Sequence, residues 1–306
     1  MAGRIAVIGS NMVDLVTYVT RMPHRGETIE APSFEMGHGG KGANQAVAAA
    51  KLGADVMMLT KVGDDMFADS TIGNLARYGV DTRHVEKVPG RSSGVAPIMV
   101  EPSGENSILI VKGANDDLLP ADIERAAEDL RRCDLILLQL EIPLETVYAA
   151  IEFGKRHGIA TLLNPAPAAA ALDPSRIRNV TFLVPNETEL AMLSGLPVDS
   201  MVEVEGAARS LMAKGIGTVI VTLGARGALL VTSAGATPIP PMVVTPVDTT
   251  GAGDAFIGSF ARYYVETADI AGALDKAVRY AADSITRRGT QKAYATEAEF
   301  QDLPQS

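Results

Sequence analysis

The sequence predicts an α/β fold in which helices cover both faces of a mostly parallel sheet. Three observations predict it. The chain has 306 residues, enough to bury a substantial core. Short apolar runs recur along it, and each is continuously apolar, as is typical of strands buried on both faces. Helical stretches separate these runs. Because ligands in such folds bind beyond the carboxyl ends of the strands, the residues that follow the runs are the first candidates for a site.

The predicted elements alternate along the chain. The predicted strands are Ile5–Ile8, Val56–Leu59, Leu135–Leu140, Ala160–Leu163, Phe182–Val184 and Val219–Leu223. The helical stretches include Ala43–Leu52, Pro120–Arg132, Leu144–His157 and Val204–Lys214. Strands that alternate with helices imply parallel pairing, with helices on both faces of the sheet.

Two segments, residues 13–35 and 92–112 in approximate bounds, lack this helical periodicity. The second contains Ser93–Val100 and Asn106–Val111, which predict a hairpin around Pro102-Ser-Gly104. We interpret both segments as insertions that form a small β-sheet lid over the edge of the main sheet. Ordinary edge strands are the alternative. We expect residues 1–306 to form a single domain.

Composition excludes several classes of function. The formal charge of −10 argues against nucleic-acid binding, which needs a basic surface. A single cysteine, Cys133, excludes an internal disulfide framework and fits a reducing cytoplasm. We expect no signal peptide, because Asp14 interrupts the apolar start. We also expect no membrane contact, because the longest uncharged span, Gly227–Val247, contains four prolines and alternates like strands and turns.

The most informative stretch is Asp248-Thr-Thr-Gly-Ala-Gly-Asp254, which an apolar-periodic run follows at once. Phe256, Phe260 and Tyr264 in that run have the spacing of a buried helical face. A helix that begins here presents unpaired backbone N–H groups and the positive end of its dipole. Asp254 alone could be a helix-capping carboxylate. The two glycines before it favour a site where a phosphate contacts the backbone and Asp254 takes a proton from an attacking hydroxyl.

A second glycine-rich run, Gly37-His-Gly-Gly-Lys-Gly-Ala-Asn-Gln45, contains a formal G-x-G-x-x-G. A dinucleotide-binding fingerprint needs a buried strand just before it. The preceding residues, Glu30–Glu35, are neither apolar nor typical of a strand. The run does not match a phosphate-binding P-loop either, because Gly42 follows the lysine where that motif requires Ser or Thr. Lys41, Asn44 and the loop amides would converge on a small volume suited to a polyhydroxylated ligand or an anion.

Polar residues follow the predicted strands. Asp14 could accept hydrogen bonds from vicinal hydroxyls or be a solvated turn residue. Glu141 ends the longest apolar strand, at the edge where ligands bind. Asn186-Glu-Thr-Glu189 could be a capping box or could hold water bound to Mg²⁺. Thr222-Leu-Gly-Ala-Arg-Gly227 is a strand-to-turn segment that could cradle a nucleotide.

Together these stretches resemble the ribokinase-like sugar kinases, the PfkB carbohydrate kinase family. The resemblance spans the whole chain, with the Gly39–Gln45 motif near the start and Asp248–Asp254 near the end. The other matches in order are Gln139-Leu-Glu141, Asn164-Pro-Ala-Pro167, Asn186–Glu189 and Thr222-Leu-Gly224. The resemblance implies a three-layer αβα core and a β-sheet lid that often forms a homodimer. It also implies ATP, Mg²⁺ and transfer of the γ-phosphate to a sugar hydroxymethyl group.

The resemblance also implies roles for single residues. Asp254 would be the general base, and the amides of Gly251, Ala252 and Gly253 the anion hole. The sugar contacts would be Asp14, Gly40, Lys41, Asn44 and Glu141. Asn186 and Glu189 would serve the Mg²⁺ and phosphate region, and Thr222, Gly224 and Gly227 the nucleotide loop. A K⁺ site would involve Asp248, Thr250, Ser284, Arg287 and Gly289. Ala293 stands where ribokinases often have Ser, which weakens the expectation of K⁺ activation.

Met12 departs from the ribokinase pattern, which has Asn at this position and uses it near the C2 hydroxyl of ribose. Methionine offers no hydrogen-bond donor. A sugar hydroxyl buried against it would lose a partner, at a cost of roughly 1–3 kcal/mol. A sugar with hydrogen at that carbon loses nothing, so the sequence predicts 2-deoxy-D-ribose as the preferred substrate, phosphorylated at its 5-hydroxyl. The alternative is that Met12 only packs, while Asn11 or a water serves ribose.

Two other functions compete with a pentose kinase. A non-catalytic sugar or nucleotide sensor would use the same scaffold, but it would need neither Asp254 nor the glycine turn before it. A nicotinamide oxidoreductase would depend on the Gly37–Gly42 pattern alone, which has the wrong preceding context.

Overall fold

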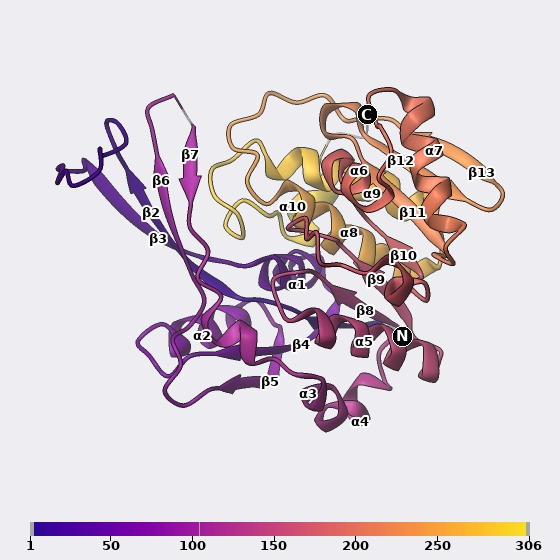
Figure 1. Ribbon diagram of the computed structural model, residues 1–306, viewed down its shortest axis with the longest axis horizontal. Coiled ribbons are helices and arrows are strands. Elements are labelled where there is room, and N and C mark those ends of the chain that lie inside the picture. The colour runs from indigo at the N-terminus through magenta and orange to yellow at the C-terminus, as the bar shows by residue number, and fades with distance from the viewer. Residues whose placement is uncertain (1–2, 104, 304–306) are drawn as a thin grey trace.

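A computed structural model describes residues 3–103 and 105–303 of the chain. Its main feature is a nine-stranded sheet with the order β13-β12-β11-β10-β9-β8-β1-β4-β5 (Figure 1). The strands are β1 (Arg4–Ile8), β4 (Asp55–Val62), β5 (Asp81–Lys87), β8 (Leu135–Leu138), β9 (Ala160–Leu163), β10 (Phe182–Leu183), β11 (Thr218–Thr222), β12 (Ala228–Thr232) and β13 (Gly235–Ile239). Pairing is parallel from β5 to β11, and β12 and β13 add antiparallel strands at one edge. All the predicted apolar runs form strands of this sheet.

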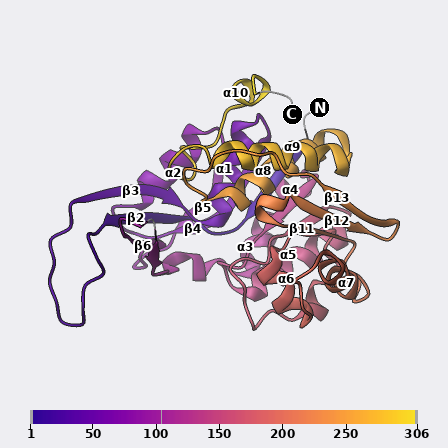
Figure 2. The same cartoon turned by 90° about the horizontal axis from the view of Figure 1, so that it is seen from above.

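Helices cover both faces of the sheet because its strands send alternate side chains to opposite sides. Ile5 and Val7 join one hydrophobic core, whereas Ala6 and Ile8 join the other. The first core is formed with α1 (Lys41–Lys51), α2 (Ala68–Arg77), α8 (Ala252–Thr267), α9 (Ile270–Ser284) and α10 (Glu297–Gln301). The second is formed with α3 (Pro120–Arg125), α4 (Ala127–Leu130), α5 (Leu144–His157), α6 (Glu187–Ser194) and α7 (Met201–Met212). The three-layer αβα core is thus confirmed, and Figure 2 shows the two helical layers on either side of the sheet.

A separate four-stranded sheet, the lid, projects from the core (Figures 1 and 2). Its order is β3-β2-β6-β7, from β2 (Met12–Tyr18), β3 (Ser33–Gly39), β6 (Val95–Val100) and β7 (Asn106–Ile108). β6 and β7 pair as an antiparallel hairpin. Gly104 of the predicted turn lies outside the described residues.

Two sequence predictions about individual elements are wrong. The residues before the glycine-rich run do belong to a strand, because β3 spans Ser33–Gly39. Its first four residues, Ser33-Phe-Glu-Met36, alternate polar and apolar and are all exposed, so the strand has no continuous apolar run like those of the main sheet. It is still not the buried strand that a dinucleotide-binding fingerprint requires. Pro120–Arg132 also forms two short helices, α3 and α4, instead of one.

Two close approaches fix how the site is assembled. A Cβ atom on Gly258 of α8 would lie 2.5 Å from Cβ of Ala48 in α1, so only glycine lets these two helices meet this closely. A Cβ atom on Gly42 of α1 would lie 2.6 Å from the backbone nitrogen of Ser10, which follows β1. The starts of α1 and α8 are thereby brought to the carboxyl end of β1. Within the described residues, no helix is long and apolar enough to cross a membrane.

Candidate active site

The start of α8 carries the carboxylate of Asp254, which is only 7% exposed. The helix begins after Gly251, whose φ of 77° is left-handed and which has no side-chain cap. First-turn amides have no acceptor within the helix. The amide of Ala252 donates to the carbonyl oxygen of Thr249 at 3.3 Å, so an anion arriving here would compete for that amide. The predicted combination of a glycine turn, a helix start and an acid is present.

The segment between α9 and α10 supports this turn from behind. The hydroxyl of Tyr294 donates to the carbonyl oxygen of Gly251 at 3.0 Å. A Cβ atom on Gly251 would lie 2.3 Å from Cγ2 of Thr290 and 2.7 Å from that hydroxyl. Both the left-handed φ and the close contacts therefore require glycine.

Two side-chain amides from α1 hold Asp254. Asn44 Nδ2 donates to Oδ2 at 3.0 Å, and Gln45 Nε2 donates to Oδ1 at 2.9 Å. Asn44, predicted to contact a sugar, therefore also contacts the acid, and its second amide hydrogen remains for a ligand. Gln45 stood within a recognised motif but was assigned no function by the sequence.

A second tier of amides lies behind these two. Gln139 Nε2 donates to Oε1 of Gln45 at 2.6 Å. Gln291 Nε2 donates to Oδ1 of Asn44 at 3.0 Å, and Gln291 Oε1 accepts from Asn74 Nδ2 at 2.7 Å. Gln139 belongs to the Gln139-Leu-Glu141 match found in the sequence, whereas no local pattern indicated a role for Gln291 or Asn74.

Glu141 caps the start of α1. Its Oε2 accepts the hydroxyl of Ser10 at 2.5 Å and the backbone N–H of Lys41 at 2.9 Å. Gly40, which precedes the helix, has a φ of 86°, and a Cβ atom there would lie 2.7 Å from Cα of Asn11. Glu141 therefore lies beyond the carboxyl end of β8 and fixes the Gly-Lys turn.

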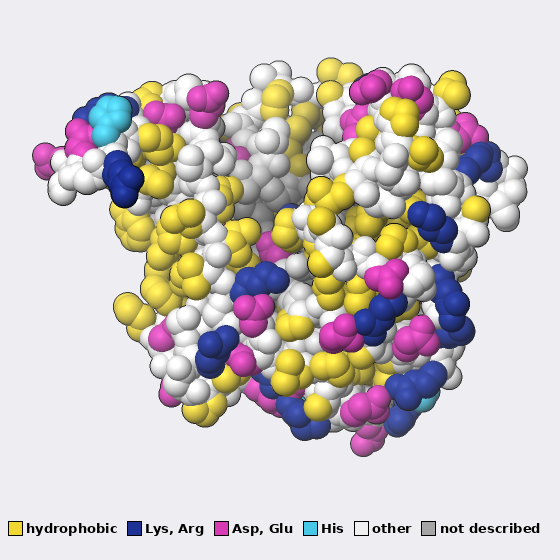
Figure 3. Space-filling model, viewed as in Figure 1, with side chains coloured by type: hydrophobic (Ala, Val, Ile, Leu, Met, Phe, Trp, Pro, Cys, Tyr) yellow, Lys and Arg dark blue, Asp and Glu magenta, His cyan; other side chains and the backbone are white. Residues whose placement is uncertain are grey.

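The site concentrates charge around one ammonium group. Burial, together with nearby Glu141 and Asp254, raises the pKa of Asp14 to about 6. Burial opposes the charge of Lys41, but Asp254, Glu141 and Glu189 outweigh it and raise the lysine pKa. Burial also raises the pKa of Glu189, while the Asn186 N–H and Lys41 oppose this. Residues from five separate segments thus share one electrostatic environment. The molecular surface is hollowed between the lid and the core (Figure 3).

The lid contributes Met12 and Asp14 from the same face of β2. Met12 pairs with Gly39 and Asp14 with Gly37 across β3, so no β3 side chain covers them. Met12 is 3% exposed, yet it belongs to neither hydrophobic core among the described residues. Asn11 is turned away, since its amide nitrogen donates to Thr60 Oγ1 at 2.8 Å and to the carbonyl oxygen of Lys61 at 2.7 Å.

The Asn186–Glu189 segment forms a capping box at the start of α6. Asn186 Oδ1 accepts the N–H of Glu189 at 2.8 Å, and Glu189 Oε2 accepts the N–H of Asn186 at 2.9 Å. An isolated bridge pairs Asn186 with Thr222 at the end of β11. The turn that follows has left-handed φ values at Gly224 (57°) and Gly227 (83°). The two segments proposed for the nucleotide and its phosphates are therefore neighbours.

The residues expected around K⁺ lie where the 248–250 and 284–293 segments meet. Asp248 accepts the N–H groups of Thr250 (2.9 Å) and Gly289 (3.0 Å), which lower its pKa against the opposing effect of burial. Ser284 donates to its own helix. Arg287 pairs with Asp283 and with the carbonyl oxygen of Ala293. Across the described ranges, no three or more His, Cys, Asp or Glu residues cluster as metal ligands.

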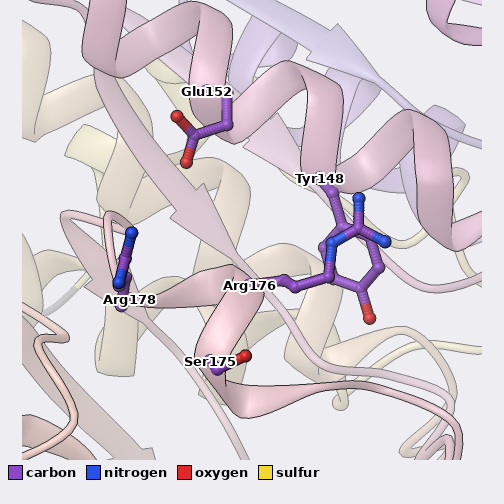
Figure 4. Close-up of a pocket in the computed structure, with 5 residues that line it drawn as sticks. All are labelled: Tyr148, Glu152, Ser175, Arg176 and Arg178. Carbon is purple, nitrogen blue, oxygen red and sulfur yellow. The ribbon is translucent and has the colours of Figure 1, made fainter.

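A depression of about 270 Å³ elsewhere on the surface is not a second candidate. Tyr148, Glu152, Ser175, Arg176 and Arg178 line it (Figure 4). The guanidinium of Arg176 lies 3.9 Å from the ring centre of Tyr148 and binds both carboxylate oxygens of Glu145. Its charge is thus already satisfied, and none of the predicted site residues lies here.

A helix start whose first amides have no acceptor within the helix, together with a buried acid and a neighbouring lysine, is the arrangement of a phosphotransferase site. The family model for pfkB family carbohydrate kinases matches residues 2–297. The chain is 60% identical to a deoxyribokinase of Salmonella typhimurium over 298 residues, which cover 97% of each protein. It is 41% identical to a ribokinase of Bacillus subtilis, with 98% of each covered.

Comparison with solved structures indicates the same family. An Arabidopsis thaliana ribokinase solved with ribose and ATP superposes with a TM-score of 0.92 at 30% identity, covering 98% of each chain. The protein therefore belongs to the pfkB family of carbohydrate kinases. It is an ATP-dependent phosphotransferase whose acceptor is an alcohol group. This excludes both the nicotinamide oxidoreductase and the non-catalytic sensor.

We expect Asp14→Asn to stabilise the ligand-free protein near pH 7.5. The folded-state pKa of Asp14, about 6, lies above the ordinary value of 3.8, so folding favours the protonated acid. The contribution of Asp14 to the free energy of unfolding is therefore fully present below about pH 4 and is lost as the pH rises through about 6. A pKa difference of about two units corresponds to about 3 kcal/mol of unfolding free energy. The uncharged variant would regain this stability near neutrality. Urea unfolding of both proteins near pH 4 and pH 7.5 measures this. An equal stability difference at both pH values would contradict it.

Proposed function

We propose that the protein phosphorylates the 5-hydroxyl of a pentose, with 2-deoxy-D-ribose as its preferred substrate. The observation that carries the proposal is the Asp254 carboxylate, held by two amide donors at a helix start whose first-turn amides have no acceptor within the helix. The 60% identity to a deoxyribokinase supports the choice of substrate. The Arabidopsis thaliana relative solved with ribose and ATP supports a pentose as acceptor and ATP as donor.

The residues perform the reaction as follows. Asp14, Gly40, Lys41, Asn44 and Glu141 hold the sugar between the sheet edge and the lid. Asp254 accepts the proton of the 5-hydroxyl as its oxygen bonds to the γ-phosphorus. The bond between that phosphorus and the bridging oxygen breaks, and ADP leaves. The amides of Gly251, Ala252 and Gly253 stabilise the transferred group. Closure of the lid excludes water and so limits hydrolysis of ATP.

Met12 carries the preference for the deoxy sugar. It is buried beside Asp14 on β2 and offers no hydrogen-bond donor to a C2 hydroxyl. Asn11 does not replace the missing donor, because its amide nitrogen already serves Thr60 and Lys61. A ribose hydroxyl placed here would lose a partner, whereas the C2 hydrogen of 2-deoxyribose would not.

Asn186, Glu189, Thr222, Gly224 and Gly227 are proposed to hold the nucleotide and its Mg²⁺. Glu189 is buried, and its carboxylate keeps lone pairs beyond those used in the capping box. Mg²⁺ usually keeps several waters and takes one or two carboxylates plus substrate phosphates. A single carboxylate close to Lys41 and Asp254 fits that pattern. The ion would neutralise charge on the phosphates during transfer.

A K⁺ ion is proposed beside the anion hole, near Asp248, Thr250, Ser284, Arg287 and Gly289. The N–H groups of Thr250 and Gly289 each occupy only one lone pair of an Asp248 oxygen, so the carboxylate can still accept a cation. The ion would order the two segments that meet here. Turnover measured at fixed Mg²⁺ with and without K⁺ tests this.

Residues 1–306 are proposed to act as one kinase domain whose lid clasps a second copy. Large apolar side chains are exposed along the lid: Phe34, Met36, Ile108, Leu109, Ile110 and Val111. Figure 3 shows such side chains gathered on the lid. A contiguous exposed apolar surface marks a contact with another protein.

The cytoplasm is the proposed location. The only cysteine, Cys133, is buried and makes no disulfide, and burial raises its thiol pKa to about 12. Such a thiol is inert and compatible with a reducing compartment. Cell fractionation tests the assignment.

Asp254→Asn is expected to lower kcat at least about a hundredfold while sugar binding is largely kept, because the base is lost and the site's shape is not. Coupled ADP release gives kcat, and calorimetry gives sugar affinity. The matched control is Asp275→Asn, which makes the same change at an exposed residue of α9 and is expected to keep full turnover. Near-normal turnover of Asp254→Asn would remove Asp254 as the base.

Met12→Asn is expected to lower the ratio of kcat/KM for 2-deoxyribose to that for ribose by about tenfold, since the new amide can pair with the C2 hydroxyl. Steady-state kinetics on both sugars measures the ratio. The same substitution at the exposed Met66, outside the lid, leaves it unchanged. An unaltered ratio in Met12→Asn would refute the role of Met12.

Phe34→Lys combined with Leu109→Lys is expected to convert a dimer into monomers, because two charges would face the partner's apolar lid. Sedimentation velocity measures the mass in solution. Met66→Lys introduces the same charge on a side chain that is 85% exposed outside the lid, and should leave the dimer intact. A parent protein that sediments as a monomer would refute the clasp.

A further inference from the structure

We propose that Gln45 and Gln291 are positioning residues that fix Asp254 through a directional chain of side-chain amides, and that this chain sets the turnover number. The inference deepens the proposed function and rests on it, because it takes Asp254 as the base. Gln45 acts directly on one carboxylate oxygen. Gln291 acts through Asn44 on the other.

Charge dictates the direction of the chain. An ionised carboxylate only accepts hydrogen bonds, so Asn44 and Gln45 must turn their NH₂ groups toward Asp254. Their carbonyl oxygens then face outward, and each meets a donor: Gln291 for Asn44 and Gln139 for Gln45. Gln291 in turn points its own carbonyl oxygen at Asn74 Nδ2. The single charge of Asp254 therefore orients every amide behind it.

The chain also fixes the rotation of the carboxylate. Both oxygens are held, at 3.0 Å and 2.9 Å, by successive residues of α1. That helix packs closely against α8, since a Cβ atom on Gly258 would lie 2.7 Å from the carbonyl oxygen of Gln45. Each carboxylate oxygen keeps a second lone pair, so one remains to accept the hydroxyl proton.

Gln291 is the informative member because it contacts Asp254 only through Asn44. It lies in the segment between α9 and α10 and is 3% exposed. Lys51 Nζ donates to its backbone carbonyl oxygen at 3.2 Å, which anchors the residue independently of its side chain. A change of its side chain removes the distal donor and leaves the backbone support in place. Without that donor the carbonyl oxygen of Asn44 loses its partner, and only the hydrogen bond to Asp254 still holds the amide.

The test compares Gln291→Met, Gln291→Glu and Gln45→Met with the parent enzyme on 2-deoxyribose and ATP. Methionine removes the donor at similar volume, and we expect kcat to fall about tenfold in both Met variants. Ionised glutamate only accepts, so it repels the carbonyl oxygen of Asn44 and competes with Asp254 for the Asn44 NH₂ group, and we expect a fall of about a hundredfold. The KM values for ATP and sugar are expected to change less than about threefold, because the misplacement acts on the chemical step.

Thr146→Val is the matched structural control. The hydroxyl of Thr146 donates to the carbonyl oxygen of Leu118 at 2.6 Å, is fully buried, and belongs to α5 in the opposite helical layer. Its loss should lower the melting temperature and leave kcat unchanged. Turnover is expressed per folded protein from circular dichroism, so instability alone cannot imitate the effect.

Two outcomes separate the chain from the proposed function. If Asp254→Asn is inactive while both Met variants keep kcat within about twofold of the parent, the positioning role is wrong and Asp254 remains the base. If Asp254→Asn keeps near-normal turnover, Asp254 is not the base, and the proposed function is wrong whatever the Met variants do. A glutamate variant no slower than the methionine variant would also overturn the directional argument.

Discussion

A carboxylate buried at the start of a helix needs donors, and much of this structure can be understood as supplying them to Asp254. Leaving such a charge unpaired would cost several kcal/mol. The helix start supplies a favourable dipole and amides that have no acceptor within the helix, and α1 supplies two side-chain donors. These donors reach the acid only because α1 and α8 pack at the distance that Gly258 permits.

The same constraint explains why the region proposed to bind the sugar lowers the stability of the ligand-free fold. Asp14, Glu141, Glu189 and Asp254 share one region with a single ammonium, that of Lys41. The result is a folded state that favours protonation of Asp14 when no ligand is present. Binding sites commonly trade stability for function in this way. A polyhydroxylated ligand would relieve the strain, because its hydroxyls donate to carboxylates that otherwise face one another.

Much of the fold could be predicted from the sequence because its strands are buried on both faces. Runs such as Leu135–Leu138 are apolar throughout and cannot be mistaken for a half-exposed strand. β3 was missed for the opposite reason, since its exposed residues alternate polar and apolar and form no continuous apolar run. The break between α3 and α4 was missed because the amphipathic pattern continues through it.

The residues of the candidate site also differ in how far the sequence predicts them. Asp254 and its glycines carry a local signal, because a turn, a helix start and an acid are adjacent in the sequence. Gln291 carries none: it meets Asn44 from 247 residues away, from a segment without regular structure. Only the three-dimensional arrangement of α1, α8 and the last segment brings the two together. Sequence patterns therefore marked Asp254 but not the distal amides that lie behind its two donors.

We propose that phosphoryl transfer takes place at the start of α8 with Asp254 as the base. A crystal structure with 2-deoxyribose and a non-hydrolysable ATP analogue tests it most directly. We predict an Asp254 oxygen within hydrogen-bonding distance of the sugar 5-hydroxyl, and the γ-phosphate against the amides of Gly251–Gly253. A sugar bound elsewhere, with Asp254 still enclosed by Asn44 and Gln45 and out of reach of any hydroxyl, would contradict it.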